Sequence, residues 1–164
     1  MIDIRFPTAL QMMLSLALAQ QESVPQLSSS QLAQSLGANP SFLRKLLASL
    51  VRDELVDSVM GKTGGVRLAR TPNQITLREI YQSVVADKKI WTPRTGIPHR
   101  CLVSSNVQSY FEELIDDAEE AILSTLGKRT LLQALTELRI RAGAPEIPSR
   151  ARRTSSARRS GRER

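Results

Sequence analysis

Residues 30–56, SQLAQSLGANPSFLRKLLASLVRDELV, constrain the fold most strongly. Ser28, just before this stretch, and Gln31 have the spacing of a capping box, which predicts that a short helix begins here. Gly37 suits the position just after the end of that helix, and Asn39 can cap a second helix only two residues later. Two helices joined by a tight turn with glycine are typical of a helix-turn-helix.

The second helix of this pair has one apolar and one polar face. Its apolar stripe consists of Phe42, Leu43, Leu46, Leu47 and Leu50, and its opposite face of Ser41, Arg44, Lys45, Ala48 and Arg52. In a DNA-binding helix-turn-helix this second helix enters the major groove. We therefore expect Ser41 and Arg44 to contact base edges, and Lys45 and Ser28 to contact the backbone. The alternative is an ordinary helical hairpin with solvated arginines.

Residues 55–70, LVDSVMGKTGGVRLAR, predict a β-hairpin directly after the second helix. Two short strands, Leu55–Met60 and Val66–Ala69, are separated by a glycine-rich tip. A hairpin in this place is a wing. The tip residues suited to phosphate or the minor groove are Lys62, Thr63, Gly64 and Gly65, the two glycines through their amides. The alternative is a plain hairpin that covers the core.

The stretch SQLAQSLGANPSFLRKLLASLVRDELVDSVMGKTGGVRLAR, followed by ITLREIYQSV, resembles the Rrf2 family of bacterial transcription regulators, in its cluster-free subgroup. The resemblance extends from Phe6 to Leu135. It implies a mainly α fold, with a winged helix-turn-helix DNA-binding domain, a small β-hairpin wing and a long dimerisation helix. Family members often have arginine before the first wing glycine and an aromatic residue after the glycine pair. Met60 and Val66 stand at those places, so no operator sequence is transferred.

The other helices follow from apolar spacing and caps. A first amphipathic helix is predicted over Pro7–Gln20, and a Thr76–Glu79 capping box begins another that runs from Leu77 to about Val85. Residues 104–126, SSNVQSYFEELIDDAEEAILSTL, predict a long helix. Its narrow apolar stripe consists of Val107, Phe111, Leu114, Ala118 and Ile122.

So narrow a stripe on so long a helix favours a second copy as its partner. In the family that this chain resembles, this helix is the dimer interface. A two-fold dimer would place two recognition helices on a pseudo-palindromic operator in double-stranded DNA, and we expect a repressor. The alternative is a helix that packs within the monomer.

Cys101 and His99 are the only cysteine and histidine of the chain, and they cannot complete a four-ligand metal site in a monomer. Cluster-binding members of the family have three cysteines in this loop, and Cys101 aligns with the last. We therefore expect no iron-sulfur cluster and no other cofactor. Cys101 precedes a helix N-terminus, which can lower a thiol pKa, so it is a candidate redox sensor. The alternative is a small apolar filler.

Most of the net charge of +7 belongs to the C-terminal tail, because residues 150–164 contain seven arginines and one glutamate. From residue 145 onward there is almost no apolar content, which predicts a disordered arm. It either grips nucleic-acid phosphates or only aids solubility. We divide the chain into a DNA-binding region over 1–86, a linker and dimerisation helix over 87–144, and an Arg-rich tail over 145–164.

Other classes of function find less support. No catalytic motif is recognisable, so we expect no enzyme. No stretch reaches the roughly 18 apolar residues of a membrane span, and a basic signal-peptide start is lacking, so we expect no membrane partner and a cytoplasmic protein. The main rival is a winged-helix protein-interaction module without specific DNA binding. The local charge of residues 28–70, six Lys/Arg against three acidic residues, favours DNA.

Overall fold

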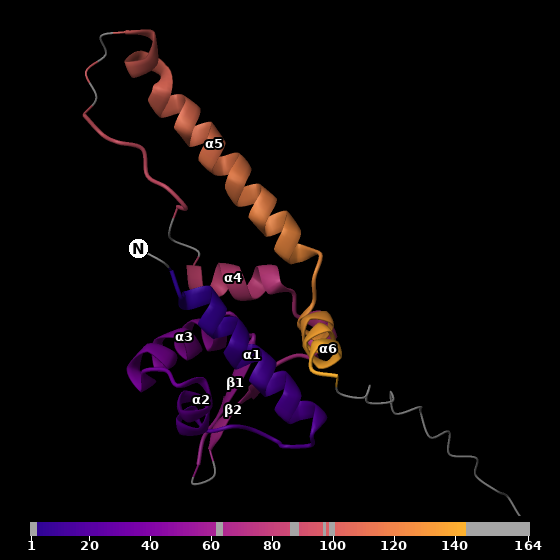
Figure 1. Ribbon diagram of the computed structural model, residues 1–164. Coiled ribbons are helices and arrows are strands. Elements are labelled where there is room, and N and C mark those ends of the chain that lie inside the picture. The colour runs from indigo at the N-terminus through magenta and orange to yellow at the C-terminus, as the bar shows by residue number, and fades with distance from the viewer. Residues whose placement is uncertain (1–2, 62–63, 86–88, 97, 99–100, 144–164) are drawn as a thin grey trace, which may run out of the picture.

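The computed structural model describes residues 3–61, 64–85, 89–96, 98 and 101–143. Its elements in chain order are α1 (Arg5–Gln21), α2 (Ser29–Leu36), α3 (Pro40–Arg52), β1 (Val56–Val59), β2 (Gly65–Leu68), the 3-10 helix η1 (Pro72–Gln74), α4 (Leu77–Val85), α5 (Leu102–Gly127) and α6 (Leu131–Arg141). Five helices and the hairpin form a body, from which α5 projects (Figure 1). The mainly α fold with a small wing is confirmed. No helix within the described ranges is long and apolar enough to span a membrane.

Capping residues set the ends of α2 as the sequence predicts. The Ser28 hydroxyl accepts a hydrogen bond from the Gln31 amide at 3.1 Å, and the Gln31 side chain accepts one from the Ser28 amide at 2.8 Å. At the other end, Gly37 has a left-handed backbone conformation with φ of +58°. The helix is therefore closed at both ends by local chemistry.

Helix α3 begins at Pro40, which needs no backbone donor there. The Asn39 side chain accepts a hydrogen bond from the Ser41 amide at 2.8 Å. Four residues of the predicted apolar stripe are buried, whereas Phe42 is half-buried. The helix-turn-helix pair is thus built as predicted.

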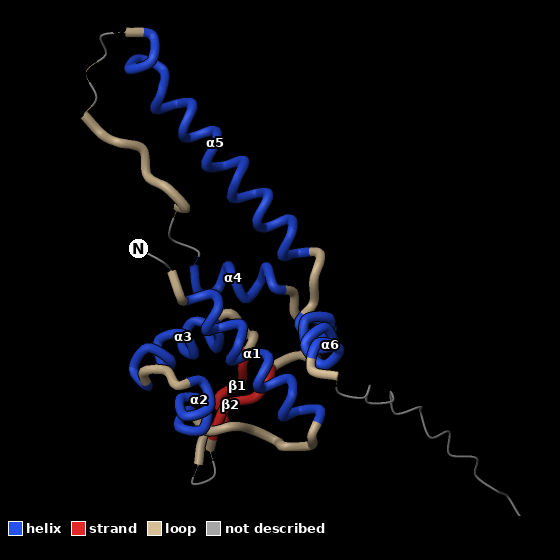
Figure 2. Tube along the Cα trace, in the orientation of Figure 1, coloured by secondary structure: helices blue, strands red, loops and turns tan. Residues whose placement is uncertain are grey.

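The hairpin is antiparallel, with Val56 opposite Leu68 and Val59 opposite Gly65 (Figure 2). Each strand differs by a residue or so at its ends from the predicted ranges. A third segment joins this small sheet, because Leu27 exchanges two backbone hydrogen bonds with Val66, at 3.0 and 2.8 Å. The chain just before α2 is therefore tied to the wing.

The core lies between α1, the helix-turn-helix, the hairpin, α4 and α6. Its fully buried side chains include Met12, Met13, Leu32, Leu43, Leu50, Leu55, Ile75, Ile80 and Leu131. At one edge, the ring of Phe6 meets that of Tyr81 edge-on, with centroids 5.3 Å apart. One apolar core therefore fixes the orientation of α3.

Helix α6, which was not predicted, returns to the body after α5. The Leu77 amide donates to the Arg129 carbonyl at 2.9 Å, and the Leu131 amide donates to the Ile75 carbonyl at 2.8 Å. These bonds join the start of α4 to the start of α6. Leu131 and Leu135 then complete the core against α1.

Helix α5 begins at Leu102, slightly before the predicted start, and Ile115 is its one buried residue. The preceding chain runs beside it (Figure 1). Lys89 forms an ion pair with Asp116 at 2.6 Å, and the Ile90 amide donates to the Glu119 carboxylate at 3.2 Å. The inner half of α5 is thus held by the chain that leads to it. The predicted tail, 145–164, lies outside the described residues.

Candidate nucleic-acid interface

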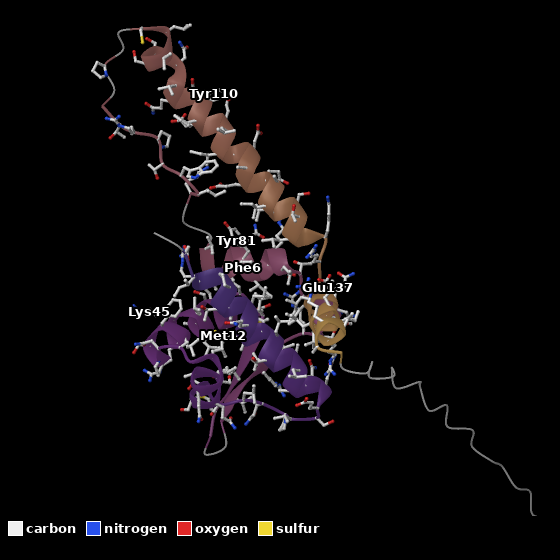
Figure 3. All side chains as sticks on the ribbon, viewed as in Figure 1. Phe6, Met12, Lys45, Tyr81, Tyr110 and Glu137 are labelled. Carbon is white, nitrogen blue, oxygen red and sulfur yellow. The ribbon has the colours of Figure 1, made fainter. Side chains whose placement is uncertain are left out.

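The outer face of α3 presents the polar side chains that the sequence singled out. Ser41, Arg44 and Lys45 are exposed, because the leucines between them occupy the core side of the helix. Figure 3 shows Lys45 on the outside of the body, away from the central Met12. The helix has no acidic residue between Pro40 and Arg52. Its exposed surface therefore carries positive charge.

Most of the other described cations in this region are neutralised by carboxylates. The ion pairs are Arg52 with Asp53 at 2.8 Å, Arg67 with Asp57 at 3.4 Å, and Arg70 with Glu79 at 2.7 Å. Among the residues that the structure describes, no carboxylate pairs with Arg44 or Lys45. These two side chains are therefore available to an external anion, as phosphate binding requires.

A groove of about 650 Å³ lies between α3 and the hairpin. Four of the predicted contact residues line it, namely Ser28, Arg44, Gly64 and Gly65. Its floor is apolar and includes Leu47, Val51, Val59 and Val66, which the sequence analysis did not assign to the site. The spacing of Leu47 and Val51 on one side of α3 was visible in the sequence, but the position of the hairpin over that side was not. Polar donors and an apolar floor suit the edge of a nucleic-acid groove.

The glycine pair is required by close backbone contacts. A β-carbon on Gly64 would lie 2.6 Å from the Val59 carbonyl oxygen, and one on Gly65 would lie 2.7 Å from that of Leu27. The Gly64 amide donates to the Gly61 carbonyl at 2.9 Å, which closes the turn. The expectation of a free Gly64 amide is therefore not met, since hairpin closure already uses it.

Two of the remaining predicted contacts lie on α3 outside the groove. Ser41 and Lys45 are on the exposed face of α3. Lys62 and Thr63 lie outside the described residues, so their assignment stays a prediction. The Ser28 hydroxyl is engaged as a cap, yet it lies at the groove wall and its helix begins there. The interface therefore combines the outer face of α3, the start of α2 and the base of the wing.

The outer half of α5 leaves much of its apolar surface in solvent. Phe111 is 42% exposed and Leu114 is 40% exposed, whereas Val107, Ala118 and Ile122 are half-buried. The prediction overlooked Leu102, Val103 and Tyr110, which are all more exposed than Phe111. Tyr110 lies toward the end of α5 that is far from the body (Figure 3). The apolar surface is thus broader than one stripe.

Cys101 is exposed and caps α5. Hydrogen bonding by the Ser104 side chain, and then by the backbone amides of Ser104 and Val103, lowers the pKa of the Cys101 thiol. The sulfur lies 3.4 Å from the Ser104 hydroxyl oxygen. The predicted position before a helix N-terminus is confirmed, but His99 and Arg100 lie outside the described residues.

Comparison with known proteins identifies the family. The family model for Rrf2, described as an iron-dependent transcriptional regulator, matches residues 2–137. YwnA of Bacillus subtilis, whose name assigns it provisionally to the HTH-type transcriptional regulators, is 23% identical over 111 residues, which are 68% of this chain and 83% of that protein.

Two solved structures share the fold. IscR of T. potens has a TM-score of 0.63 and 23% identity, covering 89% of this chain and 93% of its own. CymR, the global cysteine regulator of B. subtilis, has a TM-score of 0.58 and 20% identity, covering 84% of this chain and 97% of its own. These likenesses support the winged-helix architecture.

The side chains present do not fit an iron site. The whole sequence has one cysteine and one histidine, and iron-sulfur clusters need four ligands that are mostly thiolates. Within the described residues, no three side chains of His, Cys, Asp or Glu gather where they could hold a metal ion. The family description is therefore used for the class of protein alone. The match over residues 2–137 shows that this chain belongs to the Rrf2 family of transcriptional regulators, which are DNA-binding proteins and not enzymes.

Proposed function

We propose that the chain acts as a homodimeric repressor that reads a pseudo-palindromic operator with α3 in the major groove. The observation that carries this proposal is the unpaired positive charge of Arg44 and Lys45 beside the groove between α3 and the wing. The rest of the described basic residues around it are paired with carboxylates, so the attraction for phosphate is concentrated on this one face.

Each described residue has a role that its position supports. Arg44 lines the groove and can donate two hydrogen bonds to a guanine edge, while Ser41 lies one turn earlier on the same helix. Lys45 and Ser28 would contact phosphates. Lys62 and Thr63 of the wing tip, with the Gly64–Gly65 turn beside them, would follow the backbone or the minor groove.

A second copy is the proposed partner of α5. Phe111, Leu114 and Tyr110 leave a large apolar surface in water, and such surfaces mark sites of protein contact. A two-fold pairing of α5 would bury these side chains in both subunits. It would also fix the separation of the two α3 helices, and hence the spacing of the two operator half-sites.

Selection from fragmented genomic DNA tests the DNA assignment. We expect the purified protein to enrich a pseudo-palindromic sequence. Arg44→Ala should weaken binding by about 1–3 kcal/mol and relax selection at one position per half-site, whereas Lys45→Ala should weaken all sequences alike. Lys128→Ala, at an exposed lysine beyond the end of α5, is the matched control and should change nothing. Enrichment of no sequence would favour the protein-interaction alternative.

We further propose that Cys101 modulates DNA binding. Peroxide would oxidise its thiolate to a sulfenic acid and be reduced to hydroxide. Because Cys101 begins α5, the added oxygen or an ensuing disulfide between subunits would change the dimer contact. Footprints with reductant, with peroxide and with Cys101→Ser test this. Identical footprints under all three conditions would exclude the thiol from regulation.

A further inference from the structure

A second groove lies between α1, the end of α2, and α6. Its volume is about 530 Å³. The residues that matter here are Leu14, Leu18, Leu36, Leu135, Leu138 and Arg139. Leu138 is 46% exposed, so the groove has an apolar wall open to solvent. Neither the recognition helix nor α5 contributes to it.

Arg139 is the one charged side chain that lines this groove. One terminal nitrogen, Nη2, donates to the Gln21 side-chain oxygen at 3.0 Å. Its Nε is buried and has no hydrogen-bond partner within the described residues. In that same part of the chain no carboxylate pairs with Arg139, although its neighbour Arg141 has Glu137 at 4.0 Å.

A buried guanidinium N–H without an acceptor is unfavourable, because the group has lost water and gained no replacement. Nε itself is closed to solvent, so a ligand in the groove would reach the guanidinium through its other N–H groups, and the positive charge of Arg139, which no described carboxylate neutralises, favours an anion there. A carboxylate meets the requirement best, since its two oxygens match the geometry of a guanidinium. The leucines beside it would receive an apolar group.

We propose that this groove binds a monocarboxylate with an apolar tail, its carboxylate on Arg139 and its tail along Leu14, Leu18 and Leu138. The charge of the groove selects this occupant over the chain's own C-terminal segment. Residues 150–164 carry seven arginines and one glutamate, so they repel Arg139. Few of their side chains are apolar, and the leucine wall would remain uncovered.

The groove includes Ser35 and Leu36 at the end of α2, the helix that leads into α3. A ligand that contacts α1, α2 and α6 together would favour one position of α2 relative to the other two helices. If the protein with α2 in that position has a different affinity for DNA, ligand binding and DNA binding are coupled. This last step rests on the proposed function, whereas the binding site itself does not.

Titration calorimetry of the full chain with octanoate tests the site without DNA. We expect saturable binding at one site per subunit, and binding of octanol about tenfold weaker or more, because octanol lacks the charge. Arg139→Gln should weaken octanoate by a similar factor and Leu138→Gln should weaken both ligands. Arg141→Gln is the matched control on the same helix, since that side chain is 76% exposed and outside the groove.

Thermal unfolding of each variant shows whether it has folded, and Arg139→Lys, which keeps the charge, should retain part of the affinity. Absence of octanoate binding to the wild type would overturn the proposal. Equal binding by wild type and a folded Arg139→Gln would also overturn it. DNA affinity with and without octanoate then tests the coupling alone, so a failure there leaves the site standing, and a protein that selects no DNA can still bind octanoate.

Discussion

The body buries its apolar side chains, whereas helix α5 leaves several of its own exposed to solvent. In the body, Met12, Leu43 and Leu50 are fully removed from solvent, whereas on α5 Phe111 and Tyr110 remain 42% and 62% exposed. Five helices and a hairpin can cover one another, whereas α5 contacts the body at α4 and projects beyond it (Figure 1). We therefore expect the body to be stable by itself, and α5 to gain stability only when the proposed second subunit covers its apolar side chains.

The largest effect should come from the body. Leu50→Ala removes a fully buried side chain from α3 and should lower the free energy of unfolding by about 2–5 kcal/mol, since it loses transfer energy and leaves a cavity. Urea denaturation at several protein concentrations measures this. The loss should be the same at each concentration. A loss that disappears in dilute solution would contradict a self-contained body.

On α5, Phe111→Ala should instead weaken association, by about 2–4 kcal/mol if Phe111 lies at the centre of the interface. Sedimentation equilibrium would show a larger monomer fraction, and urea midpoints would become less dependent on protein concentration, because less of the protein is dimeric. Asp117→Ala, on the exposed polar side of α5, is the control. Equal dimer stability in the two variants would remove Phe111 from the interface.

Within the wing, Gly65→Ala should cost about 1–3 kcal/mol, because the new methyl group would lie 2.7 Å from the Leu27 carbonyl oxygen and must push the backbone aside. Gly127→Ala is the matched control, as its nearest contact would be a side-chain carbon of Arg78 at 3.6 Å. Thermal unfolding compares them. If Gly65→Ala leaves the unfolding temperature unchanged, the paired backbone of Leu27 and Val66 can shift to accommodate the methyl group.

Local signals in the sequence predicted the elements that local chemistry builds. The caps at Ser28 and Asn39 settle where α2 and α3 begin, so both helices were predicted closely. The strand ends were less accurate, because Val66 is also held by Leu27 from a distant part of the chain. Helix α6 was missed although Thr130 and Gln133 form a capping box that the sequence displays.

The sequence predicted only those residues of the site whose exposure is set by one helix. Exposure of Arg44 and Lys45 follows from the periodicity of α3, and it is what the structure shows. The apolar floor at Val59 depends on where the hairpin lies over α3, which no short pattern encodes. Likewise, Arg139 meets Gln21 across most of the chain length, so nothing local indicates the second groove.

A smaller effect is expected at the start of α4, where Glu79 caps the helix. Burial alone would raise the pKa of Glu79, but hydrogen bonds from the Thr76 amide, Arg70 and the Thr76 hydroxyl outweigh it and leave the pKa lowered. A lowered folded-state pKa stabilises the fold above the unfolded value, about 4.3, and this contribution disappears as the pH falls through the folded-state value.

Glu79→Gln should therefore reduce the free energy of unfolding at pH 7 by about 1 kcal/mol, a typical value for a cap. The difference between wild type and variant should shrink once the pH falls below about 4.3. Urea titrations from pH 7 to pH 3 measure it. Glu120→Gln, at an exposed residue of α5, should show no such trend, and a constant difference for Glu79→Gln would refute the hydrogen-bond explanation.

The smallest effect belongs to the free end of α5, where Cys101 is the cap. Alkylation by iodoacetamide should have a midpoint below about pH 8.5, the value for a free thiol, because the Ser104 side chain and two backbone amides stabilise the thiolate. Ser104→Ala should raise the midpoint, and urea should return it to the ordinary value. With one cysteine per chain, the rate reports this thiol alone. Equal midpoints in folded and unfolded protein would show that the end of α5 tunes no chemistry, and that its exposed residues serve subunit contact only.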